Sequence, residues 1–156
     1  MLNRLGITLP FVLAAGMLVA GCASTPAGEP FSRLVEPLNE RGLLYVYRPG
    51  EHYGQALSFK VMIDGKENGD VGNDAYMIIP VEPGKHSIEV KGFGYNDVPS
   101  EVEIPSGEFA FLKVVTKKGF GGFSATLSLE PASRSIALEG LAGLKREPER
   151  FVNKEI

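Results

Sequence analysis

The chain of 156 residues has few of the side chains that most enzymes use for chemistry. It contains one cysteine and two histidines, and its formal net charge at pH 7 is −3. A single cysteine excludes a framework of internal disulfides. The small net charge gives no sign of an electrostatic partner, and the basic face of a nucleic-acid-binding protein is missing. These absences point away from nucleic acid as a partner.

Motifs for catalysis and metal binding are also absent or incomplete. No G-x-S-x-G sequence is present, so the usual setting of a nucleophilic serine is missing. His52 adjoins Glu51, but two neighbouring residues chelate a metal poorly and no H-x-x-x-H pair exists. Asp64, Asp70 and Asp74 lack the alternating spacing of an EF-hand and are better interpreted as turn residues. We therefore expect neither an enzyme nor a metal site, and no cofactor beyond the covalent lipid described below.

The one long apolar run lies at the N-terminus and is short for a transmembrane helix. A positive start over residues 1–4 precedes an uncharged, mostly apolar stretch over residues 5–20. A helix that spans a bilayer needs about 20 apolar residues. A charged start, an apolar middle and small residues at the exit are typical of a secretory signal peptide, which we assign to residues 1–21.

The residues at the end of this segment indicate a function for the lone cysteine. The sequence Val19-Ala20-Gly21-Cys22 resembles the bacterial lipobox. The resemblance implies that diacylglycerol is attached to the Cys22 thiol, that the preceding peptide bond is cut, and that the new amino group is acylated. The alternative is a plain signal peptide with an incidental cysteine, although an unpaired thiol is unusual in a secreted protein. Two lipid signals already anchor a protein stably, so three acyl chains would hold it on a membrane without spanning it.

The residues after Cys22 bear on which membrane holds the protein. By resemblance to the sorting rules of Gram-negative bacteria, Ala23 and Ser24 with no aspartate favour the outer membrane, with the domain facing the periplasm. The inner membrane and the cell surface stay open as alternatives. Residues 22–41 begin with a small, polar, proline-containing stretch, so we predict a flexible tether between the lipid and the domain.

Residues 42–130 carry the pattern of a β-sandwich. Nineteen glycines and eleven prolines exceed the usual share and indicate many turns. About seven apolar or alternating stretches, separated by turn residues, predict strands: 43–47, 57–63, 76–81, 85–91, 101–104, 109–116 and 123–130. This spacing is typical of a mainly β fold, either an antiparallel β-sandwich of Ig-like type or a small barrel.

Residues 131–156 have a different composition and predict a short helix followed by a polar tail. Three apolar residues stand at helical spacing within residues 135–146: Ala137, Leu141 and Leu144. Gly140 and Gly143 weaken this helix by about 1 kcal/mol each, and Pro148 should end it. We expect the helix to pack on the sheet.

Three blocks in the strand region resemble a known family. They are Leu44-Tyr-Val-Tyr-Arg-Pro49, Val61-Met-Ile-Asp-Gly65 and Val81-Glu-Pro-Gly-Lys-His-Ser-Ile88. Their order and spacing, over roughly residues 42–144, are similar to bacterial lipoproteins with domain of unknown function 2846. The resemblance implies a β-rich envelope domain and no known reaction.

Residues within these blocks are expected to serve the scaffold. Tyr45 or Tyr47 can bury its ring and keep its hydroxyl in water. Arg48 can bond to a carboxylate or a carbonyl at the strand end. His86 lies on the apolar side of its strand, so we expect a hydrogen-bonded structural histidine.

Two glycine-rich loops are the candidate binding surfaces. Lys117 and Lys118 precede Phe120 and offer two cations and a ring to an anionic glycan or a lipid headgroup. Phe93 and Tyr95 form a similar aromatic tip that could stack on a sugar or a partner. The alternative is that Phe93 and Phe120 fold back to cap the core. The spacing of a phosphate-binding loop is absent.

The sequence therefore predicts a membrane-anchored periplasmic lipoprotein with a non-catalytic binding or assembly role in the bacterial envelope. Its covalent lipid is the diacylglycerol and N-acyl group on Cys22, and its expected partner is another envelope protein. The alternative function is a binder or carrier of a small ligand, glycan or lipid.

Overall fold

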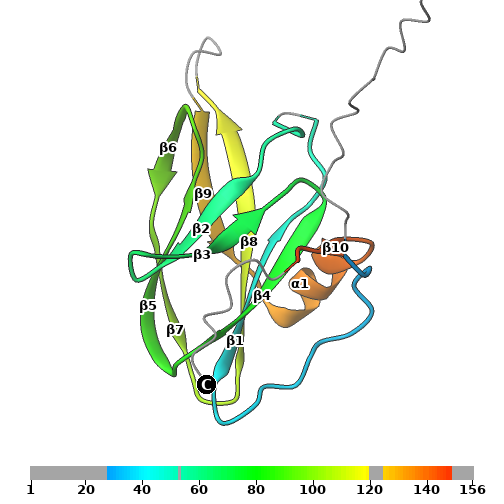
Figure 1. Ribbon diagram of the computed structural model, residues 1–156, viewed down its shortest axis with the longest axis vertical. Coiled ribbons are helices and arrows are strands. Elements are labelled where there is room, and N and C mark those ends of the chain that lie inside the picture. The colour runs from blue at the N-terminus through cyan, green and yellow to red at the C-terminus, as the bar shows by residue number, and fades with distance from the viewer. Residues whose placement is uncertain (1–27, 53, 120–124, 149–156) are drawn as a thin grey trace, which may run out of the picture.

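The computed structural model describes residues 28–52, 54–119 and 125–148, which form two packed β-sheets and one helix (Figure 1). The elements in chain order are β1 (Gly42–Arg48), β2 (Phe59–Ile63), β3 (Lys66–Val71), β4 (Ala75–Val81), β5 (Gly84–Lys91), β6 (Tyr95–Val98), β7 (Ser100–Ile104), β8 (Phe109–Lys118), β9 (Ala125–Pro131), α1 (Arg134–Leu141) and β10 (Lys145–Arg146).

The two sheets form a sandwich with open edges. The six-stranded sheet has the order β10-β4-β1-β8-β9-β6 and the four-stranded sheet has the order β3-β2-β5-β7. Between β6 and β7 the chain crosses from the first sheet to the second at Pro99. The sandwich prediction is confirmed, and the small-barrel alternative is wrong because each sheet ends in two different strands. Most neighbours are antiparallel, but β1 with β8, β4 with β10, and β6 with β9 run parallel.

Both faces of the six-stranded sheet are covered, so β1 is buried along its whole length. Leu44 and Val46 contribute to the core between the sheets, whereas Tyr45 and Tyr47 belong to a second apolar cluster. Helix α1 and the segment before β1 cover this second cluster (Figure 1). Burial on both faces explains why β1 is a continuous apolar run and lacks alternation.

The segment before β1 packs on the domain over residues 28–35. The Gly28 N–H donates to the Arg146 carbonyl at 2.9 Å, and the Phe31 N–H donates to the Leu144 carbonyl at 2.8 Å. The Phe31 ring meets the Tyr76 ring edge-on, with centroids 5.6 Å apart. This part of the expected tether is therefore fixed to the domain, and the tether hypothesis now concerns residues 22–27, which lie outside the described residues.

Helix α1 is shorter than the predicted span of residues 135–146. The Ser133 side chain caps its start by accepting a hydrogen bond from the Ile136 N–H. Beyond Leu141 the chain turns through Gly143, whose φ of +84° favours glycine. Leu144 is buried as expected but lies outside the helix, and β10 follows it. The predicted C-terminal end of the helix is therefore wrong.

Gly140 lets α1 approach β1 closely. A Cβ atom added at Gly140 would lie 2.6 Å from Cε2 of Tyr47, a contact that no real side chain makes. The glycine weakens the isolated helix, but its missing side chain sets the distance between the helix and the sheet.

Candidate functional site

The sequence-predicted binding residues that the structure describes lie together at one end of the sandwich. We call it the loop end: β1 and β8 finish there, and β2, β4, β6 and β9 begin there (upper end in Figure 1). The register pairs Ala125 with both Tyr95 of β6 and Lys118 of β8. We call the opposite end, where β1 and β8 begin, the base end.

A buried arginine holds the loop end together. Arg48 is the last residue of β1 and is completely buried. Its Nη1 donates to the Leu57 carbonyl at 2.6 Å and its Nη2 donates to the Gly54 carbonyl at 2.9 Å. Of the two partners that the sequence left open, the structure shows the carbonyls. The guanidinium therefore ties the loop between β1 and β2 to the core.

An aromatic ring supports the same guanidinium. Cζ of Arg48 lies 4.3 Å from the centroid of the Phe59 ring, within cation–π range. Burial lowers the pKa of Arg48, and the negative charge of Glu51 acts in the opposite direction. Arginine stays charged in proteins, so the loop end contains a buried cation held by neutral groups.

Tyr95 belongs to this packed cluster. Its ring contacts the Phe59 ring edge-on, with centroids 5.2 Å apart. A Cβ atom added at Gly92 would lie 2.8 Å from Phe59 and 3.0 Å from Tyr95, so the Gly92 backbone closes on both rings. The Tyr95 ring therefore packs between Phe59 and the backbone of the β5–β6 loop at Gly92.

Phe93, in contrast, projects from the surface with its side chain fully exposed, at 102% of the reference value. A turn closed by a hydrogen bond from the Tyr95 N–H to the Gly92 carbonyl, at 3.1 Å, presents it. Gly94 completes the turn with a φ of +80°. The alternative that Phe93 folds back onto the core is wrong. Phe120 lies outside the described residues.

The predicted lysines, Lys117 and Lys118, are the last two residues of β8, at the loop end. Nζ of Lys117 lies 3.1 Å from the Glu130 carboxylate, in an exposed ion pair. Lys118 is exposed at the end of β8. Cys22, the predicted lipid site, lies outside the described residues. The structure thus brings Phe93, Tyr95 and the two lysines to one end, where Phe93 and the lysines are exposed and Tyr95 is packed on Phe59.

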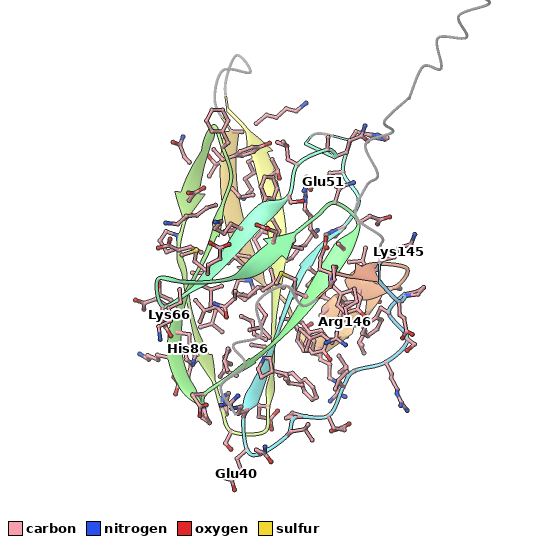
Figure 2. All side chains as sticks on the ribbon, in the orientation of Figure 1. Glu40, Glu51, Lys66, His86, Lys145 and Arg146 are labelled. Atoms are coloured by element: carbon pink, nitrogen blue, oxygen red, sulfur yellow. The ribbon has the colours of Figure 1, made fainter. Side chains whose placement is uncertain are left out.

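A pocket of about 370 Å³ lies at the loop end beside β10. Three separate segments line it: residues 55–58, 72–75 and 145–147. The Glu147 carboxylate accepts a hydrogen bond from the Gly72 N–H at 2.8 Å, and the Asn73 side chain accepts one from the Glu51 N–H at 3.0 Å. Figure 2 shows Lys145 on this side of the domain. Sequence analysis missed the pocket because no local motif joins segments so far apart.

A second polar cluster lies at the base end, around His86 (Figure 2). Nδ1 of His86 lies 2.7 Å from the Asp64 carboxylate, and Nε2 lies 2.7 Å from the Glu82 carbonyl. Asp64 also accepts a hydrogen bond from the Ser87 N–H at 2.9 Å. Both ring nitrogens face acceptors, an arrangement that only the doubly protonated ring satisfies. The prediction of a hydrogen-bonded structural histidine is confirmed.

This pairing perturbs both titratable groups. The hydrogen bond to Asp64 raises the pKa of His86 above its ordinary value of 6.5. The same bond lowers the pKa of Asp64 below its ordinary value of 3.8, and the Ser87 N–H assists. The cluster joins the β2–β3 turn to the start of β5 through a charged pair.

The tyrosine hydroxyls correct another expectation. Tyr45 and Tyr47 are both buried, so neither hydroxyl is in water. The Tyr45 hydroxyl accepts a hydrogen bond from the Val35 N–H at 2.9 Å, and burial raises the pKa of both phenols. The Tyr47 hydroxyl has no hydrogen-bond partner among the described residues.

Two further observations concern the described part of the chain only. Over residues 28–52, 54–119 and 125–148, no group of three His, Cys, Asp or Glu side chains gathers as metal ligands would. Within the same ranges, no helix has the length and apolar character needed to cross a membrane. The side chains with clearly perturbed pKa values, among them Arg48 and His86, lie outside the pocket lining.

Comparison with known proteins decides the family. The profile described as "Protein of unknown function (DUF2846)" matches residues 39–125, more than half of the chain. The chain belongs to this family. The match covers the DUF2846 domain from the turn before β1 to the first residue of β9, and so includes Arg48, His86 and Phe93. Cys22 and α1 lie outside it. A search of curated proteins found no match.

Proposed function

We propose that this DUF2846 domain is the periplasmic part of a lipoprotein anchored in the bacterial outer membrane, with a non-catalytic binding or assembly role in the envelope. The anchor is the diacylglycerol and N-acyl lipid on Cys22. Its support is the lipobox sequence around the only cysteine of the chain. A Cys22→Ser variant should leave the membrane fraction, and persistent membrane attachment would contradict the anchor.

The observation that carries the binding role is an exposed apolar surface around α1. Ala137 and Leu141 of α1 are buried in the second apolar cluster, while Ile136 is 60% exposed on the same helix. Four of the seven exposed large apolar residues in the described structure lie in α1 or the segment before β1: Val35, Leu38, Ile136 and Leu138. Ile136 and Leu138 flank the buried side of α1, and the Val35 N–H donates to Tyr45 of the same cluster, so exposed apolar side chains border one packed cluster and mark an interaction site. We call this surface the α1 face.

The sheet edges are less suitable for docking than the α1 face. Strand β10 has two residues and β6 has four, so both offer few backbone groups. Strand β3 is mostly polar and pairs with β2 through an irregularity at Val61/Met62, and β7 exposes Glu101 and Glu103. Short length, bulges and charges protect edges against strand addition. A partner protein is therefore expected at the α1 face.

Site-specific photo-cross-linking in intact cells tests this role. The full-length chain carries the photoreactive residue at Ile136, and a matched variant carries it at Glu101, which is exposed on the four-stranded sheet. The expected result is one recurrent protein adduct from Ile136 and none from Glu101. Equal patterns from the two positions, in cells where the protein stays in the membrane fraction, would contradict a binding role for the α1 face.

The pocket beside β10 supports a second candidate function, the binding of a small polar ligand. Its volume falls at the lower end of the range of about 300–1,000 Å³ that ligand pockets span. Lys145 offers a cation, while Asp74 and Glu147 offer carboxylates in the same lining. Native mass spectrometry of protein extracted from cells tests this function. A bound small molecule that Lys145→Ala removes, without loss of folding, would favour this candidate over the partner protein.

A further inference from the structure

We propose that the loop end of the domain faces the membrane that holds the lipid anchor, and that Phe93 inserts among the phospholipid headgroups. The inference rests on the anchor at Cys22 proposed above. It adds an orientation and assigns a lipid contact to Phe93, whereas the sequence suggested a lipid headgroup only for the loop of Lys117, Lys118 and Phe120.

The packed N-terminal segment shortens the connection between lipid and domain. The chain joins the domain at Gly28, which is hydrogen-bonded to Arg146 of β10. Six residue steps separate Gly28 from Cys22, and six extended residues span at most about 20 Å. A free tether over residues 22–41 would reach about 70 Å. The anchor therefore keeps Gly28 and its surroundings near the bilayer.

The register places this attachment point about midway along the sheet. Arg146 is level with Tyr76, Tyr47 and Lys113, five residues or about 17 Å short of the level of Lys118, Ala125 and Tyr95 at the loop end. Tyr95 begins β6 at the same end, on the opposite edge of the same sheet. The two edge strands are five strand spacings apart, which corresponds to about 24 Å. The six residues from Cys22 to Gly28 can cover the offset along the strands, so a bilayer that touches the loop end can receive both the anchor and Phe93.

Phe93 has the properties of an interfacial anchor. Its ring is fully exposed, and the turn of Gly92 and Gly94 that presents it is supported by the packed ring of Tyr95. Phenylalanine is one of the apolar residues that interfacial protein segments bury at the boundary between the headgroups and the acyl chains. Transfer of the exposed phenyl ring from water into this apolar layer is favourable, because apolar surface is removed from water.

The charges of the two ends favour the same orientation. At the loop end the carboxylates of Glu51, Asp74 and Glu147 offset Lys118 and Lys145, and Lys91 is paired with Glu89. The base end carries four exposed glutamates, partly offset by Arg41 and Lys85: Glu40, Glu82, Glu103 and Glu108. Figure 2 shows Glu40 at the tip of the base end. An anionic lipid surface repels the excess carboxylates of the base end, which disfavours the orientation with the base end on the membrane.

Single-tryptophan variants test the orientation, because the chain contains no tryptophan. Phe93→Trp reports on the loop end. Leu38→Trp is the matched control, since Leu38 is 72% exposed and lies beside Arg41 at the base end. Each full-length lipidated variant is reconstituted into vesicles of phosphatidylethanolamine and phosphatidylglycerol, with and without brominated acyl chains. Flotation with the vesicles is measured in the same samples, and Cys22→Ser in each background checks the anchor.

The expected result is a shift of the Phe93→Trp emission to shorter wavelength and its quenching by brominated lipid, with neither change for Leu38→Trp. If both variants float but Phe93→Trp is no more quenched than Leu38→Trp, the orientation is overturned while the anchor stands. Quenching of Leu38→Trp alone would place the other side of the domain on the lipid and also overturn it. If flotation does not depend on Cys22, the anchor fails, and the inference fails with it.

Discussion

The loop end and the base end are each held by one cationic side chain, but in different surroundings. Arg48 is completely buried and bonds to two neutral carbonyls. The His86 side chain is 12% exposed and bonds to the carboxylate of Asp64, whose side chain is 50% exposed. Arginine keeps its proton throughout the pH range of folded proteins, whereas histidine titrates near neutrality. The contacts of Arg48 therefore persist at all pH values, whereas the contact between His86 and Asp64 weakens once His86 loses its proton.

Of the two cationic side chains, the larger expected effect comes from removing Arg48 with Arg48→Met. Methionine fills part of the space but donates no hydrogen bond, so the Leu57 carbonyl loses the Nη1 donor and the Gly54 carbonyl keeps only the Leu57 N–H. A hydrogen bond to a charged group contributes about 1.5–3 kcal/mol, so the loss of two should lower the free energy of unfolding by about 3 kcal/mol. Urea denaturation of residues 28–156, followed by circular dichroism, measures the change.

A second variant at the same position separates charge from geometry. Arg48→Lys keeps the positive charge but lacks the planar fork that reaches both carbonyls. Its expected loss is smaller than that of Arg48→Met and still clear of zero. Wild-type stability in both variants would show that the loop end does not depend on Arg48.

Gly140→Ala tests packing on the opposite face of β1 from the core between the sheets, against Tyr47, and gives a stability change with which the two ends can be compared. The added methyl group meets the Tyr47 ring, and overpacking of this kind costs about 1–3 kcal/mol. The gain in helix propensity offsets about 1 kcal/mol, so we expect a net loss of about 1 kcal/mol in the same urea experiment. Glu139→Ala, at an exposed position of α1, is the control and should leave stability unchanged or slightly higher. A stabilised Gly140→Ala variant would contradict the close approach.

His86→Gln should weaken the base end in a pH-dependent way. The pKa of His86 is raised, so its stabilising effect is complete below the ordinary value of 6.5 and disappears as pH rises through the folded value. The pKa of Asp64 is lowered, so its effect is present above the ordinary value of 3.8 and disappears as pH falls through its folded value. The pair is therefore strongest between about pH 4 and pH 6.5.

In that window we expect His86→Gln to lower the free energy of unfolding by about 1 kcal/mol, a modest figure because water screens the half-exposed Asp64. At alkaline pH the two proteins should be nearly equal in stability. Urea denaturation across pH measures the difference. The loss of stability in Arg48→Met should not vary with pH over the same range. If the losses in the two variants depended on pH in the same way, the proposed difference between a pH-independent Arg48 and a pH-dependent His86 would be wrong.

The sequence predicts the parts of this fold in which local periodicity reflects burial. In β2, Phe59, Val61 and Ile63 alternate with partly exposed residues, and the structure buries all three. The same pattern places His86 near the core side of β5. These elements are predictable because one face of a strand meets the core and the other meets solvent.

The remaining elements depend on contacts between distant segments. Strands β3, β6 and β10 are edge strands with polar or short sequences, and each is defined mainly by hydrogen bonds to one neighbour. The Arg48 cluster includes Phe59 of β2 and Tyr95 of β6. The contact of Arg48 with Phe59 and the contact of Phe59 with Tyr95 cannot be predicted from the local sequence pattern. The exposure of Phe93 could not be predicted either, because a glycine-flanked ring can turn inwards or outwards.

The smallest expected effect on stability is that of Phe93→Ser, at the tip of the loop end. Its ring has no buried surface to lose, so the free energy of unfolding should change by less than about 0.5 kcal/mol. Phe59→Ala, which removes the ring beneath Arg48, is the matched contrast and should cost about 3–5 kcal/mol. Both values come from urea denaturation of residues 28–156. A clear loss of stability in Phe93→Ser would mean that the ring packs on the domain, and it would then be unable to reach the membrane. Unchanged stability leaves an exposed phenyl ring that the fold does not need, which is the condition for its use in contact with lipid.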